Sequence, residues 1–250
     1  MKLTDTALHI VSDWLLAPQY LSWLWQGFLI TLWLSLCTVI LGTALGLALA
    51  AARDSQLRLL RWPAMVYSAL FRNTPLLVQI FFWYFGAGQL FPSALMQWLN
   101  TPHSVGLAGV SLAWPSFEFL AGLLALTLYS AAFIAEEARA GILGVARGQK
   151  YAAQALGLTG WQAMRYVVLP QALEIARPPL LGQYMNVIKN SSLTMAIGVA
   201  ELSYASRQVE TETLRTFQAF GVATLLYIFI IALLEGWGQW RQQRSQSWEH

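Results

Sequence analysis

Charged side chains are scarce in this chain. Only 11% of its 250 residues are Asp, Glu, Lys or Arg, whereas 57% are hydrophobic. A soluble domain carries roughly 25% charged residues, so the composition argues against an ordinary soluble domain. No charge occurs between Asp13 and Arg53 or between Arg72 and Glu118, and each run exceeds the roughly 20 residues that a helix needs to cross a bilayer. The sequence therefore predicts an all-α polytopic membrane protein.

Reactive side chains are also few. The single cysteine, Cys37, cannot form an internal disulfide. The three histidines, His9, His103 and His250, are far apart in the sequence and suit no metal or nucleophile arrangement. No Gly-x-x-x-x-Gly-Lys-[Ser/Thr] segment occurs, so we expect no P-loop nucleotide site. We therefore expect no catalytic residues, no metal site and no cofactor in this chain, and no patch for nucleic acid.

The apolar runs predict five membrane spans, at about 21–52, 62–90, 118–138, 178–200 and 216–238. Residues 1–20 would form a short amphipathic lead-in outside the membrane, because no small-residue cleavage site follows a short apolar core there. Residues 21–250 would form a single transmembrane domain, interrupted by a long polar loop at about 139–177.

Basic residues of the connecting segments gather on one side of the membrane in this arrangement. That side holds Arg53, Arg58, Arg61, Arg139, Arg147, Lys150, Arg165, Arg177, Arg241 and Arg244. The other side holds Lys2, Arg207 and Arg215. The positive-inside rule therefore places the N-terminus outside, and the C-terminus and the loop at 139–177 in the cytoplasm.

The polar loop has the signals of two short helices. Residues 149–156 are good helix formers, and Gly157 stands where a left-handed residue would end the first helix. Thr159 and Gln162 have the spacing of a capping box that starts the second helix. We expect this helix to end before Pro170. On these grounds alone, the pair could simply pack on its own membrane domain.

The same loop resembles the EAA loop of ABC importer permeases, in which Glu-Ala-Ala, three residues, Gly, nine residues and Ile-x-Leu-Pro follow one another. Here the matching residues are Tyr151-Ala152-Ala153, Gly157 and Val167-x-Leu169-Pro170, with Tyr151 in place of the glutamate. The resemblance implies coupling helices that dock into partner ATPase subunits. The residues expected to carry this coupling are Gln149, Lys150, Tyr151, Ala152, Ala153, Leu156, Gly157, Leu169 and Pro170.

Two further segments narrow the family. FRNTPLLVQIFFWYFG, residues 71–86, resembles the Arg-Gly-Thr-Pro-Leu-Leu-Val-Gln signature of polar amino-acid permeases. Lys189-Asn190-Ser191-Ser192-Leu193 resembles their Lys-Asp-Thr-Ser-Leu segment. The chain is thus similar to the histidine, glutamine and glutamate type of importer permease. The resemblance implies a type I permease fold with five transmembrane helices, in a bacterial inner membrane. It also implies as partners two ATPase subunits carrying ATP and Mg, a second permease that is a paralogue rather than a copy, and a periplasmic amino-acid-binding protein.

Polar residues inside the predicted spans suggest a solute pathway. Pro75 removes a backbone donor and should break the second span at Thr74. Lys189 lies near the middle of the predicted fourth span, where a cation marks a pathway unless it is paired. The candidate pathway residues are Arg72, Asn73, Thr74, Pro75, Gln79, Glu136, Lys189, Asn190, Ser191 and Ser192.

Structural roles for the charged members of this set remain open. Arg72 could extend to the cytoplasmic headgroups beside a purely structural kink. Lys189 could form an ion pair with Glu136 or Glu137, and these two carboxylates could instead pair locally with Arg139.

The substrate is indicated by two asparagines. Asn190 and Asn73 stand where the branch often has Asp and Gly, and the missing carboxylate leaves the surroundings of Lys189 more positive. Both asparagines look like the sub-branch that imports glutamate and aspartate, so we expect an acidic amino acid. The alternatives are another polar or basic amino acid or derivative (glutamine, histidine, arginine or an opine) and a stand-alone secondary transporter.

Overall fold

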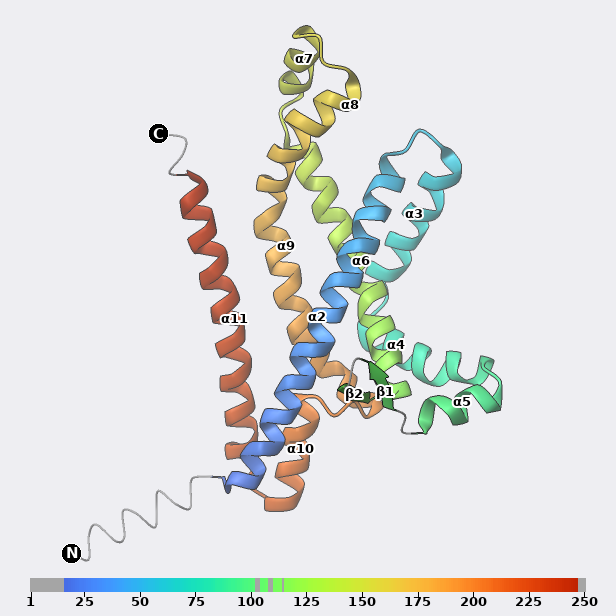
Figure 1. The fold of residues 1–250 in the computed structure, drawn as a ribbon, viewed down its shortest axis with the longest axis vertical. Coiled ribbons are helices and arrows are strands. Elements are labelled where there is room, and N and C mark those ends of the chain that lie inside the picture. The colour runs from blue at the N-terminus through green and yellow to red at the C-terminus, as the bar shows by residue number, and fades with distance from the viewer. Residues whose placement is uncertain (1–15, 102–103, 108–109, 114, 247–250) are drawn as a thin grey trace, which may run out of the picture.

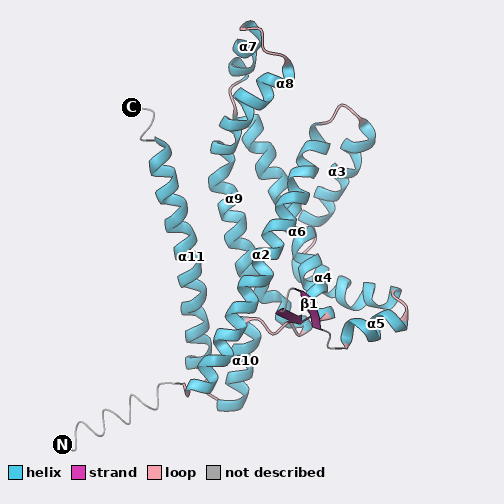
Figure 2. Cartoon of the chain, in the orientation of Figure 1, coloured by secondary structure: helices cyan, strands magenta, loops and turns pink. Residues whose placement is uncertain are grey.

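The computed structural model describes residues 16–101, 104–107, 110–113 and 115–246. Nearly all of these residues are helical (Figure 2). The elements in chain order are α2 (Pro18–Asp54), α3 (Arg58–Arg72), α4 (Leu76–Phe81), η1 (Phe82–Gly86), η2 (Ala87–Leu90), α5 (Ser93–Asn100), β1 (Ser104–Leu107), β2 (Val110–Ala113), α6 (Phe117–Gly144), α7 (Arg147–Ala155), α8 (Gly160–Ala163), η3 (Met164–Val168), α9 (Leu169–Ser191), η4 (Ser192–Ile197), α10 (Leu202–Thr213) and α11 (Thr216–Gln246). The predicted all-α class is confirmed, with one small antiparallel hairpin, β1–β2, added to it.

Helices α2, α6 and α9 form the centre of the molecule, and small residues bring them close together. A Cβ atom on Gly46 would lie 2.7 Å from Ile134, and one on Gly141 would lie 2.6 Å from the carbonyl oxygen of Ala172. Such close approach is typical of membrane helices, whose association depends on packing rather than on burial from water. Side chains at both positions would push α6 away from α2 and α9.

In the part of the chain that the structure describes, three helices are long and apolar enough to cross a membrane: α2, α6 and residues 216–242 of α11. In the most apolar stretch of each helix, 56% of the residues of α6 are buried but only 11% of those of α11. The exposed face of α11 carries Leu225, Ile228, Phe229 and Leu233, which is the composition expected where a helix faces lipid. Figure 1 shows α11 leaning against α10 at one end and diverging from α9 toward the other.

The predicted second span is divided, as its proline indicated. Helix α3 ends at Arg72, and α4 begins at Leu76, directly after Pro75. The helical path then continues through η1 and η2 as far as Leu90. The predicted break at Thr74 is therefore confirmed.

The predicted fourth span, residues 178–200, comprises the later part of one helix and the turn that follows it. Helix α9 begins at Leu169 and ends at Ser191, so Lys189 lies in the last turn of this helix. A 3-10 turn follows and closes at Gly198, which has a φ of 91°. The hydroxyls of Ser191 and Thr194 donate to carbonyls three residues earlier, at 2.8 and 2.7 Å, and such local bonds compete with continuation of the α-helix.

The two ends of the molecule are different in character. The α7–α8 pair lies at one end, together with the α2–α3 connection and the last turns of α11 (Figure 1). Helix α10, the start of α2 and the β1–β2 hairpin lie at the other end (Figure 1). Helix α10 occupies a segment that the sequence analysis treated as a connecting loop. Most of the predicted lead-in, residues 1–15, lies outside the described residues.

Candidate functional site

A tight turn joins the two short helices of the polar loop. Gly157 has a φ of 89°, the left-handed conformation that favours glycine. The Gly157 amide donates to the carbonyl of Gln154 at 2.9 Å, and the Leu158 amide donates to that of Ala153 at 3.2 Å. These two bonds are those of a Schellman motif, which ends a helix and satisfies its last carbonyls. The predicted end of the first helix is confirmed.

Helix α8 starts as predicted but does not end as predicted. The Thr159 hydroxyl accepts from the Gln162 amide at 3.3 Å, and the Gln162 side chain accepts from the Thr159 amide at 2.8 Å, completing the capping box. Helix α8 itself ends at Ala163, but the helical path does not stop before Pro170 as predicted. The π-helical turn η3 leads directly into α9, where Pro170 occupies the first turn, a position at which the missing N–H is not needed.

Four large apolar or aromatic side chains are exposed on the α7–α8 pair and the turn η3 that follows it, among exposed polar residues such as Lys150. Tyr151 is 67% exposed, Leu156 85%, Trp161 68% and Tyr166 64%. Large exposed apolar side chains on a short polar helix pair make it a candidate interaction surface. Among the residues predicted for coupling, Leu169 is half-buried and Ala153 is buried. The others are exposed: Gln149, Lys150, Tyr151, Ala152, Leu156, Gly157 and Pro170.

Trp161 and Tyr166 were not among the residues predicted from the sequence to carry coupling. Two large aromatic residues within a short polar helix pair could have indicated them as contact residues. Together with Tyr151 they give this end of the molecule three exposed aromatic side chains, a composition typical of protein interfaces.

Glu136 of α6 joins three helices at the cytoplasmic end predicted from charge. Its Oε1 accepts from the Nη1 atoms of Arg53, at the end of α2, and of Arg72, at the end of α3, the latter at 2.6 Å. The Arg72 guanidinium also lies 5.5 Å from the centre of the Phe133 ring, within cation–π distance. Glu136 therefore holds the ends of α2 and α3 against α6.

The alternative pairings proposed for these acidic residues are wrong. Glu136 pairs with Arg53 and Arg72 rather than with Lys189. Arg139 pairs with Asp54 at 2.9 Å rather than with Glu136 or Glu137. Glu137 accepts instead from the Gln183 amide at 3.4 Å.

The polar residues around the α3–α4 break bond to the backbone that the break leaves open. Gln79 Nε2 donates to the carbonyls of Phe71 and Thr74, at 2.9 and 3.0 Å. The Asn73 amide and the Thr74 hydroxyl donate to carbonyls four residues earlier, each at 2.8 Å. Carbonyls without partners are costly away from water. Gln79, which is 5% exposed, therefore stabilises the break.

Lys189 faces a small, open cavity between α9, α10 and α11. The cavity has a volume of about 280 Å³ and is lined by Lys189, by the apolar Phe220 and Ala223, and by the hydroxyl-bearing Ser192, Ser203, Thr224 and Tyr227. Among the described residues, no carboxylate lies within ion-pair distance of the Lys189 ammonium. Ser192 belongs to the predicted pathway set and lines the cavity. Ser191 is buried, and its hydroxyl donates to the backbone.

A buried carboxylate stands behind this cavity. Glu201 is fully buried and caps the start of α10, accepting from the amides of Ser203 and Tyr204, both at 2.9 Å. It also accepts from the hydroxyls of Tyr227 at 2.9 Å and of Thr31 at 3.4 Å. Glu201 was not predicted from the sequence, because an acid just after an apolar run has the pattern of a loop residue.

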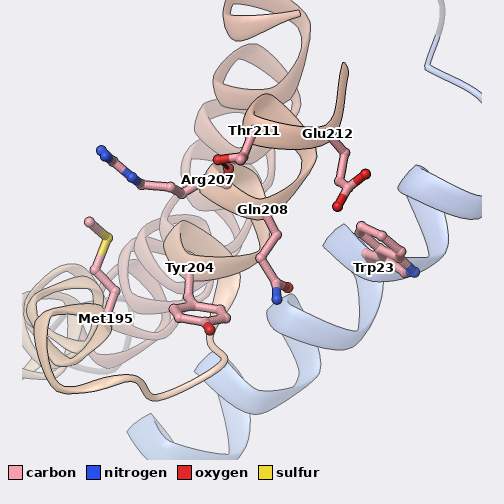
Figure 3. Close-up of a pocket in the computed structure, with 7 residues that line it drawn as sticks. All are labelled: Trp23, Met195, Tyr204, Arg207, Gln208, Thr211 and Glu212. Atoms are coloured by element: carbon pink, nitrogen blue, oxygen red, sulfur yellow. Dashed lines mark hydrogen bonds between the residues drawn. The ribbon is translucent and has the colours of Figure 1, made fainter. Parts of the chain in front are cut away.

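A second cavity, of about 390 Å³, lies between α2 and α10 at the opposite end from α7 and α8. Figure 3 shows Gln208 and Glu212 on the side of α10 that faces Trp23, and Arg207 on the other side, toward Met195. The arrangement does not gather the two charges around one ligand. In the described part of the chain, no three His, Cys, Asp or Glu residues could hold a metal ion together.

Comparisons with known proteins agree with this architecture. Residues 42–245 match the family described as binding-protein-dependent transport system inner membrane component. Over 216 residues, the chain is 35% identical to the glutamate/aspartate import permease protein GltJ of Escherichia coli K12, covering 86% of this chain and 84% of that protein. Over 205 residues, it is 36% identical to the probable glutamine ABC transporter permease protein GlnM of Bacillus subtilis, covering 82% and 85%. A crystal structure of an amino acid ABC transporter with histidines is similar with a TM-score of 0.74 and 30% identity, over 90% of this chain and 95% of that one.

Proposed function

The chain belongs to the family of binding-protein-dependent transport system inner membrane components, and from this premise we propose that it imports glutamate and aspartate. It is a multi-pass permease subunit of an amino-acid ABC importer. In the proposed complex, two ATPase subunits bind ATP and Mg, and a paralogous second permease completes the membrane part. A periplasmic binding protein delivers the amino acid. This chain contributes the path through the membrane and no ATPase site.

The proposed orientation places α7 and α8 in the cytoplasm and α10 on the periplasmic side. It is supported by the basic residues that flank α7–α8 and end α2 and α11, since all of these segments lie at one end (Figure 1). The positive-inside rule associates such an excess of Lys and Arg with the cytoplasm. The C-terminal end of α11 is then cytoplasmic as well.

The proposed coupling surface is the exposed face of α7 and α8. Tyr151 stands where the EAA loop has a glutamate, so the ring, and not a carboxylate, would contact the ATPase. The neighbouring exposed Leu156 and Trp161 extend the same apolar surface. Docking on these side chains buries area that otherwise faces water, which favours association.

The observation that supports an acidic substrate is the position of the Lys189 ammonium. It faces the cavity, and among the described residues no carboxylate lies within ion-pair distance of it. An unpaired cation at a membrane pathway attracts an anionic solute. Similarity to a glutamate/aspartate permease supports the same substrate. Glutamine is the second candidate, because a probable glutamine permease is about as similar.

Reconstitution tests the substrate directly. The chain, its ATPase and permease partners and the binding protein are placed in liposomes, and uptake of labelled glutamate, aspartate and glutamine is measured. Lys189→Met should reduce uptake while membrane insertion is retained. Asn190→Asp puts a carboxylate beside Lys189, and an opposite charge within about 4–6 Å stabilises the ammonium. Its apparent half-saturation should therefore rise more for glutamate and aspartate than for glutamine.

Equal changes for all three amino acids would contradict the acidic substrate. Uptake of glutamine alone would establish the second candidate in its place. Uptake by the chain in liposomes that lack the ATPase subunits would contradict the importer assignment and identify a secondary transporter.

A further inference from the structure

Hydrogen bonding inside the protein determines what the cavity next to Lys189 can recognise. The Ser192 hydroxyl donates to the carbonyl of Lys189, and the Thr224 hydroxyl donates to that of Phe220, each at 2.7 Å. A hydroxyl has one hydrogen to donate and two lone pairs. Both hydroxyls therefore present acceptor lone pairs to a ligand in the cavity and have no hydrogen left to donate to it.

The hydroxyls of Ser203 and Tyr227 also donate their hydrogens within the protein. Tyr227 donates to the carboxylate of Glu201 at 2.9 Å. The Ser203 and Tyr227 oxygens are 3.3 Å apart, and because the Tyr227 hydrogen is directed to Glu201, Ser203 is the donor in this pair. The chain of bonds thus runs from Ser203 through Tyr227 to Glu201, and Ser203 is left with acceptor lone pairs.

Glu201 sets the direction of this chain of bonds. Its carboxyl oxygens accept from two amides and from the hydroxyls of Thr31 and Tyr227. The Tyr227 hydrogen therefore points toward Glu201 and away from the cavity. Consecutive hydrogen bonds polarise one another, so the oxygens of Tyr227 and Ser203 become stronger acceptors. Glu201 itself is fully buried and cannot touch a ligand in the cavity.

The cavity therefore combines two opposite recognition elements. Lys189 supplies three N–H donors and a positive charge, and no described residue accepts from its ammonium. Ser192, Ser203 and Thr224 supply acceptor oxygens. An ammonium group needs acceptors and a carboxylate needs donors, and both groups occur in every free amino acid. The volume of about 280 Å³ suits a molecule of that size.

We propose that this cavity binds the zwitterionic head group of the transported amino acid, with Lys189 on its carboxylate and Ser192, Ser203 and Thr224 on its ammonium. Glu201 is a positioning residue that acts through Tyr227 and Ser203. The proposal rests on the proposed function, and it adds the residues that recognise the part shared by all amino acids.

Binding of labelled glutamate and glutamine to the purified complex, without the binding protein, tests the proposal. The competitors are glutarate, which lacks the ammonium of glutamate, and 4-aminobutyrate, which lacks its α-carboxylate. Thr224→Val and Ser203→Ala should weaken amino-acid binding about tenfold, the size of one hydrogen bond to a charged group, and should leave glutarate competition unchanged. Lys189→Met should weaken glutamate binding and remove its advantage over 4-aminobutyrate.

Matched variants separate recognition from folding. Thr211→Val makes the same change on α10 in a threonine whose hydroxyl also bonds to its own helix, at 2.9 Å, but which does not line this cavity. It should have no effect on binding. Glu201→Gln should lower the ratio of glutamate to glutarate affinity, whereas a loss of folded protein would lower both affinities by the same factor.

Two results would overturn the proposal. One is a wild-type complex that imports amino acids but binds none without the binding protein. The other is unchanged affinity ratios in the Thr224, Ser203 and Lys189 variants. Uptake into liposomes, measured in parallel, tests the proposed function independently of the cavity. The proposed function fails only if the wild-type complex imports neither glutamate, aspartate nor glutamine.

Discussion

Substitutions of Gly157 test the backbone conformation of the α7–α8 turn without changing side-chain packing in the loop. The residue has a φ of 89°, and a Cβ atom built on it would meet nothing within 4 Å. A side chain there causes no steric clash with the rest of the protein. Its entire cost is the left-handed backbone conformation, which is about 1–2 kcal/mol for a residue with a Cβ.

The size of the effect follows from this cost. Gly157→Ala should reduce the equilibrium constant that favours the native turn by a factor of about 5–30. For a marginally stable turn, the native population and the apparent affinity of an ATPase that binds only this turn fall by nearly the same factor. Gly157→Val should cost more, because branched side chains tolerate the left-handed region least. Gly157→Asn should be close to wild type, since asparagine adopts this conformation at helix ends.

The chain offers a matched control three residues after Gly157. Gly160, the first residue of α8, also has nothing within 4 Å of a built Cβ, but its φ is not positive. Gly160→Ala should therefore leave coupling intact. The assay is ATPase subunit binding to the permease in detergent, followed by ATP hydrolysis stimulated by the loaded binding protein in liposomes. Alanine at 157 within twofold of wild type, or equal damage at 157 and 160, would refute the reasoning.

Two further predictions concern orientation and the inner ion pairs. In a Cys37→Ser background, cysteine at Glu212 should react with an impermeant maleimide added outside sealed cells, and cysteine at Gln154 should not; both positions are exposed. The reverse labelling pattern would invert the proposed orientation. Glu136→Gln should lower the free energy of unfolding by roughly 1–3 kcal/mol, because Arg53 and Arg72 lose a charged acceptor. Glu137→Gln loses one 3.4 Å bond and should barely change the thermal midpoint; equal midpoints for the two variants would contradict this account.

The features that could be predicted from the sequence are those set by neighbouring residues. The Schellman turn at Gly157 and the capping box of Thr159 and Gln162 each depend on a few consecutive backbone positions. The break before α4 depends on Pro75 and the residue before it. Each of these was stated from the sequence and is confirmed, because local steric rules act regardless of how the helices pack.

The features that could not be predicted depend on the rotation and depth of whole helices. Glu136 could have faced Lys189 or Arg139, and only the packing of α2, α3 and α6 directs it to two other arginines. The end of α9 just after Lys189 was not predicted, because it depends on serine and threonine hydroxyls that bond to the preceding turn of backbone. The end assigned to α8 was wrong because a π-helical turn accommodates Pro170, and a single extra residue in a turn has no clear sequence signal.

The position of α6 connects the coupling surface with the rest of the permease. This helix ends at Gly144, and α7 begins at Arg147, so a displacement of α7 is transmitted to α6 through a very short connection. Two turns before that end, Glu136 is tied to α2 and to the last residue of α3. Arg72 borders the break that Gln79 closes. In the proposed coupling, a movement of α7 and α8 would reach the α3–α4 break through the two ion pairs of Glu136 as well as through the close packing of α6 on α2.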